Sequence, residues 1–387
     1  MFGIGTVSQT AIDPNYVFTV DTSNTSSGDP SLTSYKFHTN GTSVTATGSI
    51  LWEEVGNPSN NGTFNWDASV STTSPVITFP SEGKYKISVP ETIDWGNPKH
   101  IAASIGKEKL IEVNNWGNHI FPNLYLAYYQ CNNLKLKAQD APILGRNYSI
   151  ERVFNRTANQ SGFEDVSGSL SIWNTQYCSN TSYAFANCYT MNTDVSTWDI
   201  SNVTNTSYMF SYARAFNHPI DTHQVIANGR TYDAWDVSNV TTMNRMLNGS
   251  STLTGSFNQD LNNWDVRKVT NMTELFQGQT SFNGNITNWN PHSCSIFAKT
   301  FRYCNSFNQD LGSWDVSKAT RMDEMFNQCF VFNQDITNWD VSNVTLLNAM
   351  FTNCYVFNQP LGEWDIQSAT NLSLMMYNCF DFNQDIS

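Results

Sequence analysis

Charged residues are scarce in this 387-residue chain, where Asp, Glu, Lys and Arg together make up 14% of the sequence. An average globular protein has about 25%. Basic residues are the scarcer class, with 20 Lys and Arg against 33 Asp and Glu, so the formal net charge is −13. Nucleic acids and anionic lipids are bound by clustered Lys and Arg. The sequence therefore predicts neither a nucleic-acid-binding protein nor one that docks on an anionic membrane.

Long apolar segments are also missing. No stretch approaches the roughly 20 apolar residues that span a bilayer, so we expect no membrane insertion. The first residues, MFGIGTVSQTAIDPNYVF, lack the basic and apolar regions of a secretory signal. We expect the protein either to stay inside the cell or to reach the outside by another route, such as assembly into a virus particle.

Motifs of catalysis and metal binding are absent as well. The sequence contains no P-loop, GxGxxG, GxSxG, HExxH or CxxC pattern, each of which has a defined chemical role. Its six histidines are scattered and are expected to lie in loops or in solvent. They are His38, His100, His119, His218, His223 and His292. We therefore expect no catalytic residues, no cofactor and no metal site, and we predict that the protein is not an enzyme.

What the chain does have is tryptophan at a fixed interval. The interval is 25 residues from Trp173 to Trp198, and again at each step from Trp264 to Trp364 through Trp289, Trp314 and Trp339. Trp235 follows Trp198 by 37 residues and precedes Trp264 by 29. These two gaps place a twelve-residue insertion within His218–Ala234 and a four-residue insertion near Gly249–Gly255. Such a period is typical of a solenoid, in which each unit buries its apolar edge against the next.

Other apolar residues keep the same phase. The residue 12 positions after each tryptophan is Phe185, Phe210, Leu247, Phe276, Phe301, Phe326, Phe351 or Met376. The recurring FNQD[LI] segment reads as a short strand, and M-x-x-M-F-x-x-C has the apolar spacing of one or two helical turns. Weaker units are expected before Trp173, around Tyr128 and around Val153-Phe154. The pattern predicts a leucine-rich-repeat-like solenoid of short strands and short helical turns.

The eight cysteines also follow the repeat. Cys188, Cys304, Cys329, Cys354 and Cys379 each lie three residues after the apolar position, and Cys131 matches them in the early unit; Cys178 and Cys294 take a place held by valine elsewhere. Free cysteine packs as a small apolar side chain. We expect reduced, inward-facing thiols, with a disulfide between neighbouring units or a metal site as the alternatives.

An Asp follows the tryptophan in most units. These residues are Asp199, Asp236, Asp265, Asp315, Asp340 and Asp365. Asp side chains commonly accept hydrogen bonds from nearby backbone N–H groups in turns, and we expect that role here. A row of carboxylates can also hold calcium, but the known calcium-loop patterns are absent; calcium binding is the alternative.

The blocks FNQDLNNWDVRKVTNMTELF, FNQDLGSWDVSKATRMDEMF and FNQDITNWDVSNVTLLNAMF resemble the 25-residue repeat of BspA-like, mycoplasma-lipoprotein-type bacterial surface proteins. The resemblance covers about residues 125–387 and implies a surface-exposed, non-enzymatic protein of adhesion or recognition. Upstream, YVFTVDTSNTSSG and ITFPSEGKYKISV resemble the immunoglobulin-like, PKD-type module that often precedes such repeats. The W-G-D-G strand of that module is replaced here by LWEEVGNP.

The N-terminal region contains short alternating runs between Gly, Asn, Ser and Pro clusters, a pattern typical of a β-sandwich. The runs are Tyr16–Val20, Tyr35–Phe37, Ser49–Trp52, Thr63–Trp66, Val76–Phe79 and Lys84–Val89. The whole fold is thus expected to be mainly β. We predict an immunoglobulin-like sandwich over 1–95, a joint and cap over 96–124, and repeats over 125–387. The last unit stops at Ser387 without a polar cap, so we expect the natural chain to continue or another subunit to cover this end.

These features predict a non-enzymatic structural or adhesion protein on a virion surface, as a fibre, spike or capsid decoration. A bacterial or protist cell-surface adhesin is the alternative, and a polysaccharide-degrading solenoid enzyme is a third. The expected partners are a host-surface receptor or glycan, or neighbouring subunits of a larger assembly. Insertions in solenoids often mark the binding side. The candidate contact residues are therefore His218, Asp221, His223, Arg230 and Tyr232.

Overall fold

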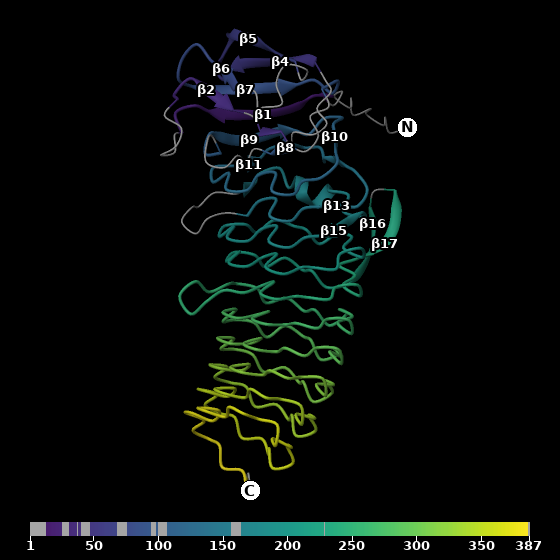
Figure 1. Cartoon of the computed structure of the whole chain (residues 1–387), viewed down its shortest axis with the longest axis vertical. Helices are drawn as coiled ribbons and strands as arrows, with labels where there is room; N and C mark the ends of the chain where they lie inside the picture. The colour runs from purple at the N-terminus through teal and green to yellow at the C-terminus, as the bar shows by residue number, and fades with distance from the viewer. Residues whose placement is uncertain are drawn as a thin grey trace, which may run out of the picture.

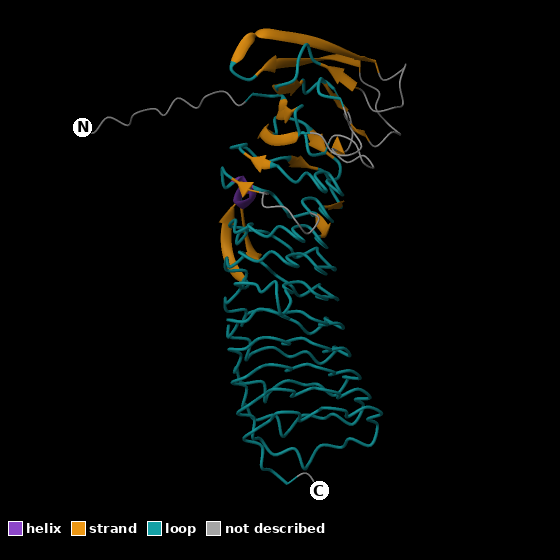
Figure 2. Ribbon diagram, turned by 90° about the vertical axis from the view of Figure 1, so that its left-hand side faces the viewer, coloured by secondary structure: helices purple, strands orange, loops and turns teal. Residues whose placement is uncertain are grey.

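The computed structural model describes residues 13–24, 31–36, 38–39, 47–67, 76–93, 98–99, 107–155, 164–227 and 229–385. They form an elongated molecule with strands at the N-terminal end and a long stack of turns that runs to the C-terminal end (Figures 1 and 2). The described part is mainly β: its single helix is the four-residue 3₁₀ helix η1 (Ser169–Ile172), and its strands form no closed barrel.

Seven strands of the described region share one sheet, in the order β14-β11-β9-β1-β7-β4-β5. Their bounds are β1 (Tyr16–Asp21), β4 (Thr47–Glu54), β5 (Asn57–Asp67), β7 (Lys84–Val89), β9 (Leu110–Asn115), β11 (Lys135–Leu136) and β14 (Glu164–Asp165). Two small pairs accompany it, β2 (Ser34–Lys36) with β6 (Val76–Thr78) and β3 (His38–Thr39) with β8 (Pro98–Lys99). Each of the six alternating runs expected from the sequence contributes to a strand, although Phe37 lies outside the described residues.

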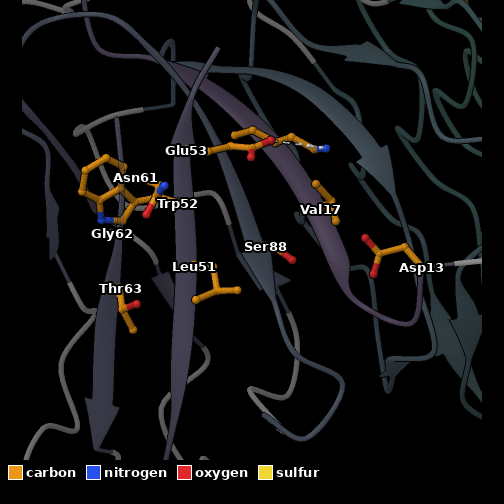
Figure 3. Close-up of a pocket in the computed structure, with 10 residues that line it drawn as sticks. Asp13, Val17, Leu51, Trp52, Glu53, Asn61, Gly62, Thr63 and Ser88 are labelled. Carbon is orange, nitrogen blue, oxygen red and sulfur yellow. Dashed lines mark ion pairs between the residues drawn. The ribbon is translucent and has the colours of Figure 1, made fainter. Parts of the chain in front are cut away.

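Side chains on one face of this sheet build the N-terminal core. Tyr16 and Phe18 of β1 are fully buried, and so are Tyr85 and Ile87 of the antiparallel neighbour β7. Successive residues of a strand point to opposite faces of the sheet, so residues such as Leu51 of β4 lie on the other face. This face carries a shallow pocket (Figure 3). The sheet therefore has one apolar face and one largely polar face, as expected for an antiparallel sheet that covers a core on one side.

Strand β9 connects the N-terminal strands to the repeats. It pairs antiparallel with β1 and parallel with β11, which in turn pairs parallel with β14. Pairing thus changes from antiparallel to parallel at a strand that lies within the predicted joint, residues 96–124. Because the first repeat turns extend the same sheet, the edge of the stack is hydrogen-bonded instead of open to water.

The remaining strands are short. They are β10 (Ile120–Phe121), which pairs with β12 (Ile143–Leu144); β13 (Tyr148–Ser149), which pairs with β15 (Cys178–Asn180); and β16 (His223–Ala227), which pairs with β17 (Arg230–Ala234). Beyond β15, successive units are joined by one parallel bridge each, seven residues after the tryptophan. These bridges run from Asn180 through Asn205, Thr242, Asn271, Ile296, Arg321 and Leu346 to Asn371. Equivalent positions of neighbouring units therefore lie side by side along the stack.

The local structure of each unit differs from the sequence expectation. The FNQD segment forms no strand, and the M-x-x-M-F segment forms consecutive turns instead of a helix. Backbone N–H groups in this segment alternate between two kinds of acceptor: Leu275 donates to Met272 of its own unit at 3.1 Å, whereas Phe276 donates to Thr300 of the next unit at 2.9 Å. Every second N–H is therefore committed to the neighbouring unit, which is incompatible with the i to i−4 bonding of an α-helix.

This alternation requires left-handed backbone at fixed positions. The residues 10 and 14 positions after the tryptophan repeatedly have positive φ, as in Glu274 at 54° and Gly278 at 77°. Most of these residues are not glycine; Lys299 at 59° and Gln328 at 66° are examples. Left-handed backbone costs an ordinary residue about 1 kcal/mol or more, so the bonds between units must offset that cost in every turn.

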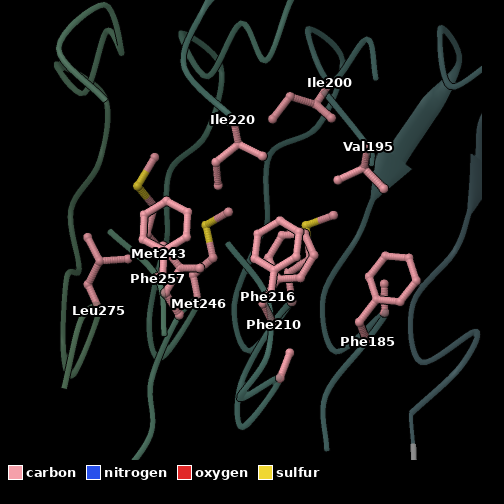
Figure 4. Close-up of a cluster of buried hydrophobic side chains, with 14 of the residues drawn as sticks. Phe185, Val195, Ile200, Phe210, Phe216, Ile220, Met243, Met246, Phe257 and Leu275 are labelled. Atoms are coloured by element: carbon pink, nitrogen blue, oxygen red, sulfur yellow. The ribbon is translucent and has the colours of Figure 1, made fainter. Parts of the chain in front are cut away.

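Aromatic columns fill the interior of the stack (Figure 4). Phe276, Phe301 and Phe326 lie in successive units with ring centroids 5.6 and 5.7 Å apart and nearly parallel planes. Tyr128 and Phe154 continue this column toward the N-terminus at 5.6 Å, and Phe154 reaches Phe185 at 5.6 Å. The two weaker units expected before Trp173 are therefore confirmed as part of the same column.

The tryptophans form a second column. Neighbouring indoles stack at 5.8 to 6.4 Å in several steps, among them Trp289 on Trp314 and Trp339 on Trp364. The Trp289 indole N–H donates to the Leu261 carbonyl of the preceding unit at 2.7 Å, and Trp339 donates to Leu311 at 3.0 Å. The indole thus supplies both apolar area and a bond between units, which explains why tryptophan recurs at this position.

The thiols lie inside the stack, as expected. All eight cysteines are reduced thiols; seven are buried and Cys379 is half-buried. Cys304 and Cys329 donate their S–H to the carbonyls of Phe276 and Phe301 in the preceding unit, both at 3.1 Å. Burial raises the pKa of the Cys178 and Cys294 thiols to about 12. These groups are therefore neutral packing elements instead of nucleophiles.

Candidate functional site

The twelve-residue insertion forms a β-hairpin on the flank of the stack, visible beside the regular turns in Figure 1. Strands β16 and β17 pair antiparallel from His223 opposite Ala234 to Ala227 opposite Arg230. Gly229, in the connection, has φ of 72°, a conformation that glycine adopts without strain. The hairpin therefore departs from the periodic surface of the stack.

Two of the predicted contact residues anchor this hairpin. The Arg230 guanidinium donates to Asp199 at 2.6 Å, and the Asp199 side chain is only 4% exposed. Arg230 also lies 4.0 Å from the centre of the Tyr232 ring, and the Tyr232 hydroxyl donates to the Thr197 carbonyl. Arg230 and Tyr232 therefore attach the hairpin to the preceding unit through the Arg230 Nη2 group and the Tyr232 hydroxyl.

The other three predicted residues lie at the base of the hairpin. Asp221 is half-buried and accepts bonds from the backbone N–H groups of Thr222 and Asn263, both at 2.9 Å. Burial raises the pKa of this carboxyl above its usual value, although these N–H bonds oppose the effect. His223 donates to the Asp221 carbonyl and His218 to the Asn192 carbonyl. His223 is exposed and His218 is half-buried, so His223 in particular can contact a partner as well.

The outward face of the hairpin contains residues that the sequence reasoning missed. Ile226 is 84% exposed, the highest value among the large apolar side chains of the described residues. Its cross-strand partner is Thr231, and the neighbouring exposed pair is Gln224 with Asp233. A sequence signal for this face did exist, because Asn228-Gly229 between two alternating runs is typical of a tight hairpin.

A ladder of polar side chains runs along another surface of the stack. Asn283, Asn308, Asn333 and Asn358 each accept, through Oδ1, the backbone N–H of the equivalent asparagine in the next unit at 2.9 to 3.0 Å. A glutamine one position later adds a second bond, as Gln334 does to Asn308 at 2.9 Å. The frequent asparagines of the sequence therefore bond the units to one another, which favours a stiff rod.

Stacked tyrosines lie near the start of the stack. The rings of Tyr183 and Tyr208 are 4.3 Å apart with planes 7° from parallel. The Arg152 guanidinium lies 4.5 Å from the Tyr183 ring centre, while Arg245 donates to the Tyr208 hydroxyl and to Glu274, both at 2.8 Å. Because the facing ring surfaces cover each other, this group stiffens the surface more than it offers a platform for a flat ligand.

The Asp residues that follow the tryptophans act as expected. Asp199, Asp236, Asp265, Asp315, Asp340 and Asp365 each accept the backbone N–H two residues later, at 2.9 to 3.2 Å. Within the described residues, no group of three or more His, Cys, Asp or Glu side chains is arranged to hold a metal ion. The same part of the chain contains no apolar helix of membrane-spanning length.

Comparison with known proteins gives one match. The family model described as "Mycoplasma protein of unknown function, DUF285" matches residues 124–233, 225–330 and 298–387. These three matches together span residues 124–387, more than half of the chain. No curated protein and no solved structure matches significantly. The matched region coincides with the stacked units, and the strand-rich N-terminal region lies outside it.

Proposed function

We propose that this chain, which belongs to the Mycoplasma-associated repeat family DUF285, is a non-enzymatic structural and adhesion protein displayed on a surface. In this proposal the repeats form a leucine-rich-repeat-like solenoid, preceded by an immunoglobulin-like β-sandwich. The solenoid acts as a stiff spacer and carries the binding element. The observation that carries the proposal is the β16–β17 hairpin, which presents Ile226 at 84% exposure on the flank of the rod.

The chemistry of the hairpin supports binding. Exposed apolar side chains on a rigid, anchored element lose little conformational entropy when they become buried, so they contribute more free energy of association than mobile ones. Arg230 and Tyr232 provide that anchoring, and the polar side chains of Gln224, Thr231 and Asp233 surround Ile226. An apolar centre with a polar rim is the usual anatomy of a protein-binding patch.

The buried thiols and the bonded carboxylates argue in the same direction. A nucleophilic cysteine needs a lowered pKa and access to substrate, whereas these thiols are buried with raised pKa values. The Asp residues after the tryptophans are engaged by backbone N–H groups. We therefore place the function in the surface of the rod and not in a reaction centre.

The first candidate carrier is a virus particle, with the protein as a fibre, spike or capsid decoration that contacts a host receptor or neighbouring subunits. The second is a bacterial cell surface, which the Mycoplasma family match favours. Gold labelling with an antibody against residues 221–234 separates the two carriers. Label is expected on intact particles in the first case and on intact cells in the second; label that requires permeabilisation of both would contradict surface display.

Adhesion itself is tested with Ile226→Ser. Beads coated with the protein are expected to bind host cells or purified particles, and Ile226→Ser is expected to reduce the bound fraction at least about tenfold. Val331→Ser is the matched control, because Val331 is exposed at 44% on the regular part of the stack. Equal adhesion of both variants and the parent protein would exclude the hairpin as the binding element.

A further inference from the structure

The outer face of the N-terminal sheet contains a pocket (Figure 3). The strands β4 and β5, which contribute to it, lie at the N-terminal end of the molecule, away from the β16–β17 hairpin (Figure 1). Its volume is about 350 Å³, near the lower end of the range for small-molecule sites. Strands β1, β4, β5 and β7 form its base. Its lining includes Val17, Leu51, Glu53, Asn61, Lys86 and Ser88. Because these strands are fixed in one sheet, the pocket exists before any ligand binds.

The floor of the pocket is apolar. Leu51 is 49% exposed on this face, whereas Val17, which also lines the pocket, is almost fully buried at 2%. The core lies on the other side of β4, where Trp52 packs its ring edge-on against Phe79 and Tyr85 at 5.6 Å. Leu51 therefore contributes little to the core, and its exposure leaves a small apolar surface surrounded by polar groups.

The polar groups around this floor mix donors and acceptors. Glu53 and Lys86 form an ion pair at 3.8 Å with both side chains 46% exposed, so their charges largely compensate. Thr63 and Ser88 carry hydroxyls that both donate and accept. Asn61 donates its amide N–H to the Pro58 carbonyl at 2.9 Å, which fixes the orientation of the amide. Such a set suits a ligand with several hydroxyl groups.

The charge around the pocket restricts the ligand further. Asp13 adds a carboxylate at the rim, held by the backbone N–H of Asn15 at 3.0 Å. Together with the net charge of −13, this carboxylate disfavours anionic ligands. A neutral pyranose ring has an apolar C–H face that can cover Leu51, while its hydroxyls can reach the polar side chains around it. An aliphatic ligand would displace water from these polar groups without giving them hydrogen-bond partners, at a cost of about 1–3 kcal/mol for each desolvated group.

We propose that this pocket binds one neutral pyranose residue of a glycan. The assignment does not depend on adhesion by the hairpin, because the two sites use different strands and different side chains. It adds a carbohydrate-binding site to the strand-rich end of the molecule, outside the region that the repeat family covers.

The test uses the full chain and a panel of methyl glycosides of glucose, galactose, mannose and N-acetylglucosamine. Saturation-transfer NMR detects binding, and titration of backbone amide shifts gives the affinity. N-acetylneuraminic acid and glucuronic acid are the anionic controls. At least one neutral glycoside is expected to bind saturably and to shift amides of β4, β5 and β7, whereas the anionic sugars are expected to bind at least about tenfold more weakly.

Three variants connect this binding to the pocket. Leu51→Ser removes the apolar floor and Asn61→Ala removes the fixed amide; each is expected to weaken binding at least about tenfold. Asn65→Ala is the matched control, because Asn65 lies on the same strand and the same face but outside the lining. Circular dichroism and thermal melting establish that all three variants fold. The proposal is overturned if no neutral glycoside binds, if the anionic sugars bind equally well, or if both pocket variants retain parental affinity.

Discussion

Single side chains in this protein carry roles that depend on their position in the unit. The cysteine three residues after the apolar phenylalanine is an example. Its S–H donates a hydrogen bond to a backbone carbonyl of the preceding unit. Burial raises the pKa of the Cys379 thiol to about 11 from an ordinary 9.0, and that of Cys178 to about 12. In the unfolded chain these thiols ionise near pH 9, whereas in the folded chain they stay neutral.

Stability is therefore expected to fall as the pH rises above 9. The folded state holds more protons than the unfolded state in this window, so the free energy of unfolding decreases with pH until the folded thiols ionise. Below pH 9 the contribution is complete. Thermal melts from pH 8 to 11 measure the effect, and Cys178→Ala should flatten the slope. A melting temperature that stays constant or rises across this window would contradict the buried, neutral state of the thiols.

The same burial predicts how the thiols react. Under native conditions at pH 8, a disulfide reagent should modify Cys379 first, because it is the half-buried thiol of the set, and should modify the other seven only after unfolding. Mass spectrometry of the labelled peptides identifies the sites. Rapid modification of Cys304 or Cys329 in the folded protein would show that the column of thiols faces solvent.

The inserted hairpin is the element whose attachment can be tested most sharply. Arg230→Ala leaves the Asp199 carboxylate buried without its cation, although Ser201 still donates to it at 3.0 Å. We expect a loss of about 1–3 kcal/mol, consistent with a buried charged bond that retains one partner. Limited proteolysis should then cut within residues 223–234. Arg267→Ala is the control, since the Arg267–Asp265 pair is exposed, and it should leave the cleavage pattern unchanged.

The asparagine ladder gives a second prediction for the repeated element. Asn308→Ala removes the acceptor of two bonds, from the Asn333 backbone and from the Gln334 side chain. A loss of about 1–2 kcal/mol in the free energy of unfolding is expected. Asn288→Ala is the matched control, because the bond of Asn288 to Asn262 uses its backbone N–H. Equal denaturation midpoints for the two variants would show that the ladder contributes no stability.

The sequence predicted the period, the apolar column and the inward thiols, because each depends on a side chain that recurs at one phase. It failed for the backbone within the unit. The M-x-x-M-F spacing suits a helix, yet alternate N–H groups bond the next unit, and residues such as Glu274 adopt left-handed backbone. Such bonds exist only once the units are stacked, so no local pattern reveals them. For the same reason the sequence did not reveal the intramolecular partners of Arg230 and Tyr232, because Asp199 and Thr197 lie in the preceding unit.

At the scale of the whole molecule, stability should be distributed along the stack. In a linear array each unit contacts only its neighbours. Phe301→Ala removes a ring that stacks on Phe276, Phe307 and Phe326 and should cost about 3–5 kcal/mol. Hydrogen exchange should accelerate in the units around residues 276–326, while β1 and β7 keep their protection. Phe380→Ala, at a ring that is 72% exposed, should change little; a uniform loss of protection would contradict a linear array.

The central claim is that units 25 residues apart lie in register as one continuous stack. Paired cysteines test it directly. Asn271 and Ile296 form a parallel bridge between neighbouring units, whereas Asn271 and Arg321 are two units apart. Neighbouring strands lie about 4.8 Å apart, within reach of a disulfide, and a two-unit separation of about 10 Å is not. Mild oxidation followed by peptide mapping should give the 271–296 crosslink in Asn271→Cys/Ile296→Cys and none in Asn271→Cys/Arg321→Cys. Crosslinking of both pairs to the same extent, or of neither, would contradict the stack.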